Sequence, residues 1–248
     1  MLTMAESKRP SPKTAIFATQ LLKMAKKKLI RFADIKTMDC VFEPTIEMCL
    51  EDSFPLKGKW RKDFFKNDHP LIVELGCGKG EYAVQLGEKY SEKNFVGLDI
   101  KGARIWYGAN TVRKKKLHNV AFVRTKIEFA DTFFGKDEVD EIWLTFSDPQ
   151  PNKPKKRLTS PWFIDRYRKF LKPGGFIHLK TDNTMLFDWT LHQINNEGYK
   201  LVECTWDLYG DMDKFSPESQ EILSIRTHYE TIFWEKGFDI KYCKFVIS

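Results

Sequence analysis

The residues best placed to do chemistry are a glycine-rich loop and an acid that follows it in the chain. The loop, E-L-G-C-G-K-G from Glu74 to Gly80, comes directly after an apolar run at 71–75 and before a segment with a helical pattern. Glycines in such a turn allow a ligand to approach the backbone closely. Asp99 ends the next apolar run, 95–99, where a carboxylate can bind the two hydroxyls of a ribose. A structural turn followed by an unrelated acid is the alternative, but the strand–turn–helix context favours an adenosine site.

Two features of the loop favour S-adenosylmethionine over a dinucleotide. Its glycines, Gly76, Gly78 and Gly80, have the spacing G-x-G-x-G and not G-x-G-x-x-G. Glu74 would repel a pyrophosphate, whereas S-adenosylmethionine has no phosphate and carries an ammonium and a sulfonium group. The pattern E-x-G-x-G-x-G resembles motif I of class I methyltransferases. That resemblance implies that Glu74 and the loop face the methionine end of the cofactor, with Asp99 on the ribose.

A second region of chemical interest follows the apolar run at 141–146. Residues 147–157 contain three prolines, which predict an extended loop. Asp148 begins this loop at the end of the fourth strand, which lies beside the first in a doubly wound sheet, so both loops meet at one crevice. The charges in the loop would form either a solvated surface or, beside a cofactor crevice, a phosphate-binding rim. The rim would consist of Lys153, Lys155, Lys156 and Arg157.

Short apolar runs alternate with helix-length segments through the rest of the chain. Beyond 71–75, the predicted strands are 95–99, 120–124, 141–146, 175–181, 199–206 and 240–247. The predicted helices include 102–114, 160–171 and 184–197. This alternation predicts an α/β, Rossmann-like class I methyltransferase fold. We expect a largely parallel seven-stranded sheet with an antiparallel last strand and helices on both faces.

The start of the chain has a different character. Residues 1–13 are predicted to be disordered, 14–31 have a basic helical pattern, and 32–69 carry weak signals. We therefore expect a partly disordered, basic extension over residues 1–65 and the methyltransferase domain over 66–248.

Composition sets broad limits on function. The chain has 248 residues, with 41 Lys and Arg against 34 Asp and Glu, for a net charge of +7. Such an excess indicates either a polyanionic partner or a solubilising surface. Five cysteines without a C-x-x-C pair predict reduced thiols and no metal site. With no apolar stretch of membrane length, we expect a cytoplasmic protein with no membrane or metal partner, either a monomer or a homodimer.

Three further motifs are similar to those of the bacterial tRNA (guanine-N7)-methyltransferases. F-S-D-P-Q-P-N-K-P-K-K-R (146–157), L-K-T-D-N (179–183) and T-H-Y-E (227–230) resemble F-[SP]-D-P-W-x-K-x-R-H-x-K-R-R, K-T-D and T-x-[FY]-E, in the same order. The resemblance implies methyl transfer from S-adenosylmethionine to N7 of guanine 46 in the variable loop of tRNA. It implies that Asp148 is catalytic and also lines the cofactor pocket. The RNA contacts that it implies are Asp182, Thr227, His228, Tyr229 and Glu230.

The chain departs from the family pattern at three positions. Gln150 stands where many members have Trp. Asn152 occupies the position of a substrate-binding lysine, so we expect that role from either Asn152 or Lys153. Lys126 replaces an Asp or Asn that adjoins the adenine, and it remains a candidate for cofactor contact.

Several of these residues also have structural explanations. Asp182 could cap the helix that begins near Thr184. Thr227 and Glu230 have the T-x-x-E spacing of a capping box, which is the favoured interpretation when the motif is taken alone. Either residue can serve both purposes.

The expected chemistry needs few catalytic groups. Guanine N7 carries an in-plane lone pair and no proton, so the enzyme must position it and need not supply a general base. A carboxylate such as Asp148 could stabilise the positive charge that develops on the purine. Two alternatives remain: a methyltransferase acting on another RNA site or a small molecule, and an RNA-binding protein without activity. The basic loop disfavours a small molecule, and Glu74 with Asp99 disfavours a protein that only binds RNA.

Overall fold

The computed structural model describes residues 26–247, so the expected disorder at 1–13 lies outside the described residues. The strands are β1 Val41–Phe42, β2 Leu71–Leu75, β3 Asn94–Asp99, β4 Val120–Arg124, β5 Val139–Thr145, β6 Leu171–Thr181, β7 Lys200–Thr205 and β8 Lys241–Val246. The helices are α2 Ile46–Leu50, α3 Glu81–Lys89, α4 Gly102–Lys115, α5 Pro161–Tyr167, α6 Thr184–Asn196, α7 Pro217–Leu223 and α8 His228–Glu235. Residues 26–35 are also helical.

All eight strands belong to one sheet with the order β1-β4-β3-β2-β5-β6-β8-β7. Neighbours pair in parallel except at β8, which is antiparallel to both β6 and β7. This arrangement confirms the predicted α/β fold class. The sheet has one strand more than the seven predicted, because β1 adds to the edge through Val41 and Phe42 beside β4. A strand of two residues has no periodicity that a sequence pattern could reveal.

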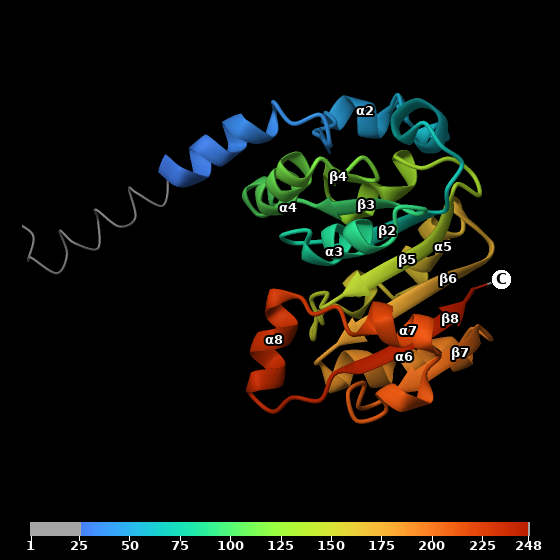
Figure 1. Ribbon diagram of the computed structural model, residues 1–248. Helices are drawn as coiled ribbons and strands as arrows, with labels where there is room; N and C mark the ends of the chain where they lie inside the picture. Colours follow the sequence, from blue (N-terminus) through green and yellow to red (C-terminus); the bar gives the residue numbers. More distant parts are fainter. Residues whose placement is uncertain (1–25, 248) are drawn as a thin grey trace, which may run out of the picture.

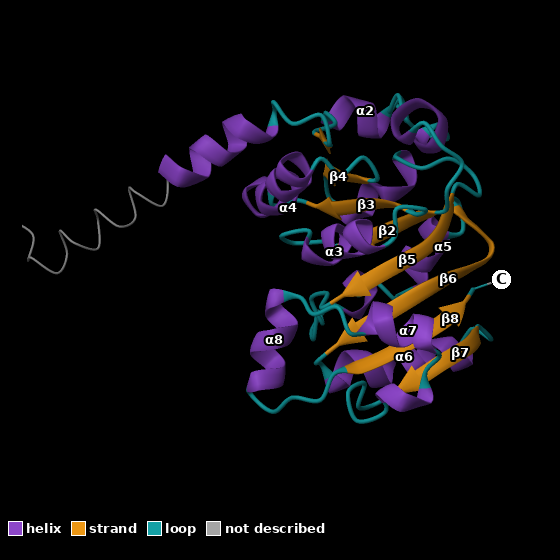
Figure 2. Ribbon diagram, viewed as in Figure 1, coloured by secondary structure: helices purple, strands orange, loops and turns teal. Residues whose placement is uncertain are grey.

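Helices cover both faces of the sheet (Figure 1; Figure 2). Side chains alternate along a strand, so Leu71 and Val73 of β2 join one core while Ile72 joins the other. The first core also contains residues of α5 and α6, and the second contains residues of α3, α4 and α7. Because both faces are covered, β2 and β3 are buried at every residue.

Residues 35–65 pack against the sheet as part of the same body. Ile35 joins the core beneath α4, while Phe54, Trp60 and Phe65 join the opposite core. Trp60 is fully buried, and its indole N–H donates to the carbonyl of Phe133 at 2.8 Å. This segment therefore contributes to folding as the strands do, although its apolar residues follow neither a helical nor a strand period.

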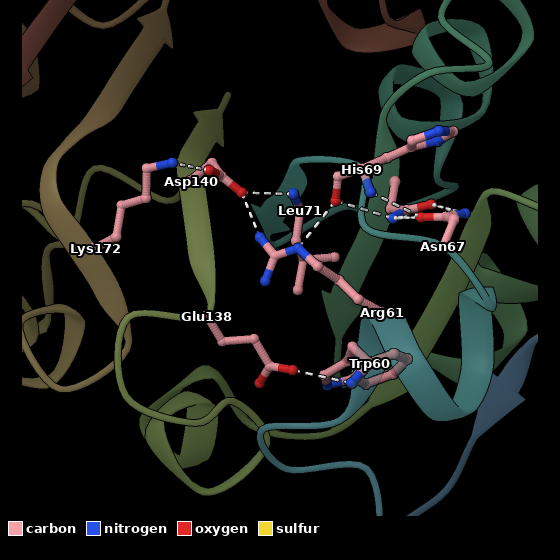
Figure 3. A network of polar contacts seen from close by, with 9 residues as sticks. Trp60, Arg61, Asn67, His69, Leu71, Glu138, Asp140 and Lys172 are labelled. Carbon is pink, nitrogen blue, oxygen red and sulfur yellow. Dashed lines mark hydrogen bonds and ion pairs between the residues drawn. The ribbon is translucent and has the colours of Figure 1, made fainter.

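Polar contacts fix the start of β2 against the start of β5 (Figure 3). Asp140 forms an ion pair with Arg61 at 2.5 Å and accepts a hydrogen bond from the backbone N–H of Leu71 at 2.7 Å. Glu138 accepts a hydrogen bond from the backbone N–H of Trp60 at 2.9 Å. The glycine loop at the other end of β2 therefore follows a strand whose beginning is fixed to β5.

Candidate active site

A pocket of about 820 Å³ lies at the carboxyl ends of β2 to β6, within the size range of small-molecule sites. The loops that follow these strands meet along this edge, as expected for a doubly wound sheet. Seven candidate residues identified from the sequence line the pocket: Gly76, Asp99, Lys126, Asp148, Lys156, Asp182 and Tyr229. The remaining candidates lie outside its lining: Glu74, Gly78, Gly80, Asn152, Lys153, Lys155, Arg157, Thr227, His228 and Glu230.

Asp99 is held rigidly at the end of β3. Its Oδ2 accepts a hydrogen bond from the backbone N–H of Gly78 at 2.9 Å, and its Oδ1 accepts from Lys101 N–H at 2.7 Å. A carboxylate has about four acceptor positions, so two remain free on the pocket side. The arrangement can therefore bind a pair of hydroxyl groups without losing the contacts that orient it.

The three glycines of the loop have different structural roles. Gly76 has φ +84° and lines the pocket, so its left-handed backbone opens space beside Ile127. Gly78 has φ +57° and makes the hydrogen bond to Asp99. Gly80 has φ +69°, and a Cβ added there would lie 2.4 Å from the Phe122 ring. The first glycine therefore shapes the cavity, and the last lets α3 begin close against β4.

Glu74 lies beneath the loop, with 4% of its surface exposed. Its Oε1 accepts a hydrogen bond from the Thr145 hydroxyl at 2.5 Å, and its Oε2 accepts from Ala83 N–H at 3.2 Å. Burial raises the pKa of this carboxyl group to about 7. Glu74 therefore connects β2 to β5 and α3, and its charge can change near neutral pH.

Asp148 is exposed at the beginning of the loop after β5 and lines the pocket. Its Oδ1 accepts a hydrogen bond from the backbone N–H of Gln150 at 3.0 Å, which forms a local turn. Phe146, two residues earlier, stacks on Phe233 of α8 with ring centroids 6.3 Å apart and also lines the pocket. The turn orients the Asp148 carboxylate while its second oxygen remains available.

The basic tract after Asp148 divides into an outward part and an inward part. Lys153, Lys155 and Lys156 are exposed, and Lys156 lines the pocket. Arg157, by contrast, has only 4% of its surface exposed and is not part of the expected rim. A buried guanidinium cannot contact a phosphate backbone, so the prediction that Arg157 belongs to the phosphate-binding rim is wrong.

Arg157 instead holds the loop in shape. Its Nε donates to the carbonyl of Pro149 at 3.1 Å, and its Nη2 donates to the carbonyl of Pro151 at 3.4 Å. Its guanidinium lies 4.7 Å from the centroid of the Trp189 ring in α6. Arg157 therefore connects the loop that begins at Asp148 to the helix that follows β6.

Asp182 follows β6 and lines the pocket, half buried. Burial raises the pKa of its carboxyl group above the usual value. The cap of α6 is not Asp182 but Asn183, whose side-chain oxygen accepts from Leu186 N–H at 2.8 Å. The Asp182 carboxylate is therefore left for a ligand in the pocket.

The four residues of T-H-Y-E, at the start of α8, have different structural roles. Thr227 and Glu230 form a capping box, with the Thr227 hydroxyl accepting from Glu230 N–H at 3.2 Å and Glu230 Oε2 accepting from Thr227 N–H at 3.2 Å. Tyr229 is 40% exposed and lines the pocket, with the Arg104 guanidinium 5.7 Å from its ring centroid. His228 is exposed outside the lining.

Lys180 and Glu230 form a fully buried ion pair, which sequence reasoning missed. The Lys180 Nζ lies 2.6 Å from Glu230 Oε1, and neither side chain is exposed. Lys180 also donates to the carbonyls of Leu223 at 2.8 Å and Ile225 at 3.0 Å. A lysine inside a buried apolar strand was the available signal, because such a charge requires a partner. The pair fastens the segment before α8, and α8 itself, to β6.

Two further observations concern metal ions and membranes. Among residues 26–247, no group of three or more His, Cys, Asp or Glu side chains is arranged to hold a metal ion. Within the same residues, no helix is long and apolar enough to cross a membrane.

Comparison with known proteins identifies the family of the chain. A family model described as "Putative methyltransferase" matches residues 68–243. The chain is 49% identical to the tRNA (guanine-N(7)-)-methyltransferase of Bacteroides fragilis over 224 residues, which cover 90% of this chain and 87% of that protein. It is 52% identical to the protein of the same name from Porphyromonas gingivalis over 195 residues, 79% of this chain and 78% of that protein.

Solved structures share the fold at low sequence identity. The 16S rRNA methyltransferase KamB superposes with a TM-score of 0.56 and 15% identity, covering 75% of this chain and 92% of that chain. A 16S rRNA (adenine(1408)-N(1))-methyltransferase from Catenulisporales acidiphilia has a TM-score of 0.55 and 14% identity, covering 76% and 91%. These likenesses concern the class I methyltransferase fold alone. The family model and the high identities over most of the chain are more specific: the chain belongs to the tRNA (guanine-N(7)-)-methyltransferase family.

Proposed function

We propose that this protein transfers a methyl group from S-adenosylmethionine to N7 of a guanine in tRNA, at position 46 of the variable loop. The observation that carries the proposal is one pocket that brings together Asp99, suited to a ribose, and Asp148, suited to a reacting base. Lys156 of the following loop lines the same pocket, and Lys153 and Lys155 are exposed in that loop. The names of the relatives at 49% and 52% identity support the same reaction.

The residues present fit S-adenosylmethionine. Asp99 would bind the ribose hydroxyls, and Gly76 would give the cofactor a close approach to the backbone. Ile100 and Ile127 line the same pocket and supply apolar surface for the adenine, with Lys126 beside them. When bound, the cofactor supplies an activated methyl group on a sulfonium. The acidic charge of Asp99, with Glu74 beneath the loop, suits a cationic ligand and disfavours a phosphate.

Asp148 would act on the developing charge of the base. N7 needs no deprotonation, so the contribution of the protein is to align the base and to stabilise the cation that forms. The turn to Gln150 fixes one carboxylate oxygen of Asp148, a residue that lines the pocket, and leaves the other oxygen available. Asp182 and Tyr229 lie at the same cavity and are the candidates for holding the guanine.

The RNA contacts that we propose are those that the geometry allows. Lys156 at the pocket and the exposed Lys153 and Asn152 can meet the backbone of the tRNA. His228 is also exposed, in the same T-H-Y-E segment as Tyr229. Thr227 and Glu230 would act indirectly, by placing Tyr229. The protein would work in the cytoplasm, where its substrate is found, as a monomer or a homodimer.

The test is to incubate the full chain with S-adenosylmethionine and unmodified tRNA, and to map modified nucleosides by mass spectrometry. We expect 7-methylguanosine in the variable loop. Methylation at another RNA position or on a small molecule would replace this proposal with the first alternative. Binding of tRNA without methyl transfer would indicate a protein that only binds RNA.

A further inference from the structure

The helix formed by residues 26–35 is firmly attached to the domain. Asp34 accepts a hydrogen bond from the Trp106 indole N–H at 2.5 Å and forms an ion pair with Arg113 at 3.0 Å. Ile35 is fully buried in the core beneath α4. The residues before Asp34 are therefore held at a fixed place on the surface. Their charged side chains take no part in the core.

Arg31 lies on an aromatic platform of α4. Its guanidinium is 5.0 Å from the centroid of the Trp106 ring and 4.4 Å from that of Tyr107. Tyr107 is 40% exposed, and Lys79 Nζ lies 5.7 Å from its ring centroid. Within residues 26–247, no carboxylate lies at ion-pair distance from Arg31, so its charge is oriented but not neutralised.

The same surface continues to the mouth of the pocket. Arg104, one turn before Tyr107 on α4, lines the pocket and stacks beside Tyr229. In the other direction, the Phe32 ring packs so closely on Gly102 that an added Cβ would lie 2.8 Å from it. Because Phe32 meets the first residue of α4, the residues before it extend past that helix at the carboxyl edge of the sheet. Figure 1 shows this helix projecting beyond α4 on the side where the strand arrows end.

We propose that this surface binds the phosphate backbone of the RNA substrate outside the pocket for the target base. We define the basic-aromatic strip as Lys27, Lys28, Arg31, Lys79 and Tyr107. It ends at Arg104, which lines the pocket. Within residues 26–247, Lys27, Lys28 and Arg31 have no carboxylate at ion-pair distance, whereas Lys79 Nζ lies 3.8 Å from Glu81 Oε1. Cations without a carboxylate partner suit phosphate groups, and the exposed Tyr107 ring between them suits an unstacked base. This proposal rests on the proposed function, which identifies the ligand as tRNA. It adds a role in RNA binding for the helix at residues 26–35.

The strip predicts that affinity for RNA depends on charges far along the chain from the catalytic motifs. Each phosphate contact contributes about 0.9 to the slope of log affinity against log salt. Replacing two contacting cations should therefore flatten the slope by about 1.8 and weaken binding near 0.15 M salt by roughly tenfold or more. Replacing cations at the opposite edge of the sheet should not change the affinity for RNA in this way.

The experiment compares two strip variants with a matched control. The first is Lys28→Gln with Arg31→Gln, and the second is Lys27→Gln with Lys28→Gln, which leaves the stacking on α4 intact. The control, Lys114→Gln with Lys136→Gln, removes the same charge from exposed positions in the last turn of α4 and before β5. For each protein, unmodified tRNA binding is titrated at several salt concentrations, and the KM for tRNA and the affinity for S-adenosylmethionine are measured.

We expect both strip variants to show the weaker, less salt-dependent tRNA binding and a raised KM for tRNA, with unchanged cofactor affinity. The control should match the wild type in all three measurements. If wild-type protein methylates tRNA but the strip variants bind it with wild-type affinity and salt slope, the strip proposal is wrong while the proposed function stands. If the wild type does not methylate tRNA, the proposed function fails first. Equal losses in the strip variants and the control would also overturn the strip, since they would show only a net-charge effect.

Discussion

Replacing Glu230 with Gln should lower the free energy of unfolding, because the substitution breaks a buried ion pair. We do not expect its main effect to be the loss of an RNA contact. Neither Lys180 nor Glu230 has exposed surface, and the three protons of Lys180 are directed at Glu230 and the carbonyls of Leu223 and Ile225. Burial lowers the pKa of the Lys180 ammonium group, an effect that the charge of Glu230 opposes. Glu230→Gln removes that charge and leaves the ammonium group without an anion.

The expected cost follows from that geometry. Removing one partner of a buried pair leaves an uncompensated charge and costs about 3–5 kcal/mol. Glu230 also accepts hydrogen bonds from the Tyr209 hydroxyl and from Thr227 N–H. A Gln amide cannot accept with both of its end atoms, so one donor loses its partner. We therefore expect the free energy of unfolding to fall by about 3 kcal/mol.

The measurement is a double-mutant cycle by chemical denaturation, with Glu230→Gln, Lys180→Met and the two combined. The double variant has no buried charge, so it should recover about 2 kcal/mol or more of the combined single losses. The single variants should also raise the KM for tRNA, because α8 carries Tyr229 and Phe233 into the pocket. The exposed substitution His228→Gln on the same helix is the control and should leave stability unchanged.

The reasoning would be refuted by additivity. If the losses of the single variants simply sum in the double variant, the two side chains are not coupled, and the ion pair does not hold α8. A Glu230→Gln protein with wild-type stability but impaired tRNA affinity would instead make Glu230 a direct RNA contact.

Three other predictions concern Glu74 and Asp99 at the glycine loop and Arg157 in the loop after β5. The raised pKa of Glu74 means that the folded state binds its proton more tightly, so stability should fall as pH rises from about 4.5 to about 7, by about 3 kcal/mol, and Glu74→Gln should remove this part of a pH series of unfolding curves. Asp99→Ala should weaken S-adenosylmethionine binding by about 1–3 kcal/mol in calorimetry, because ribose hydroxyls lose their acceptor; no change would remove Asp99 from the ribose site. Arg157→Gln should lower turnover roughly tenfold without flattening the salt dependence of tRNA binding, since Arg157 holds carbonyls and not phosphates. Lys153→Gln should do the reverse, and identical behaviour of the two variants would contradict the division of the tract.

The fold and the pocket were predictable because they depend on strand ends. Apolar runs at 71–75 and 120–124 coincide with β2 and β4, and the helix expected at 102–114 is α4 within one residue. In a parallel sheet, the positions after each strand meet at one edge. That rule alone brings Asp99 and Asp148 to the same cavity.

The direction of long side chains was not predictable in the same way. Arg157 follows two exposed lysines in the sequence, yet it turns inward because two proline carbonyls and the ring of Trp189 offer it partners. Those partners are eight, six and thirty-two residues away, at positions that only the folded loop brings together. The docking of residues 26–35 on α4 depends likewise on Asp34 meeting Trp106, a contact that no local period encodes.

The most direct test of the proposed mechanism is single-turnover methylation of unmodified tRNA by the Asp148→Asn variant, with S-adenosylmethionine affinity measured separately. Asn keeps the shape of the side chain and can accept the hydrogen bond from Gln150, but it removes the charge that would stabilise the cationic base. We expect the rate of methyl transfer at N7 to fall by at least roughly a hundredfold, with a smaller change in cofactor affinity. A variant that methylates the same guanine at the wild-type rate would show that Asp148 only shapes its loop, and it would contradict the catalytic role proposed for it.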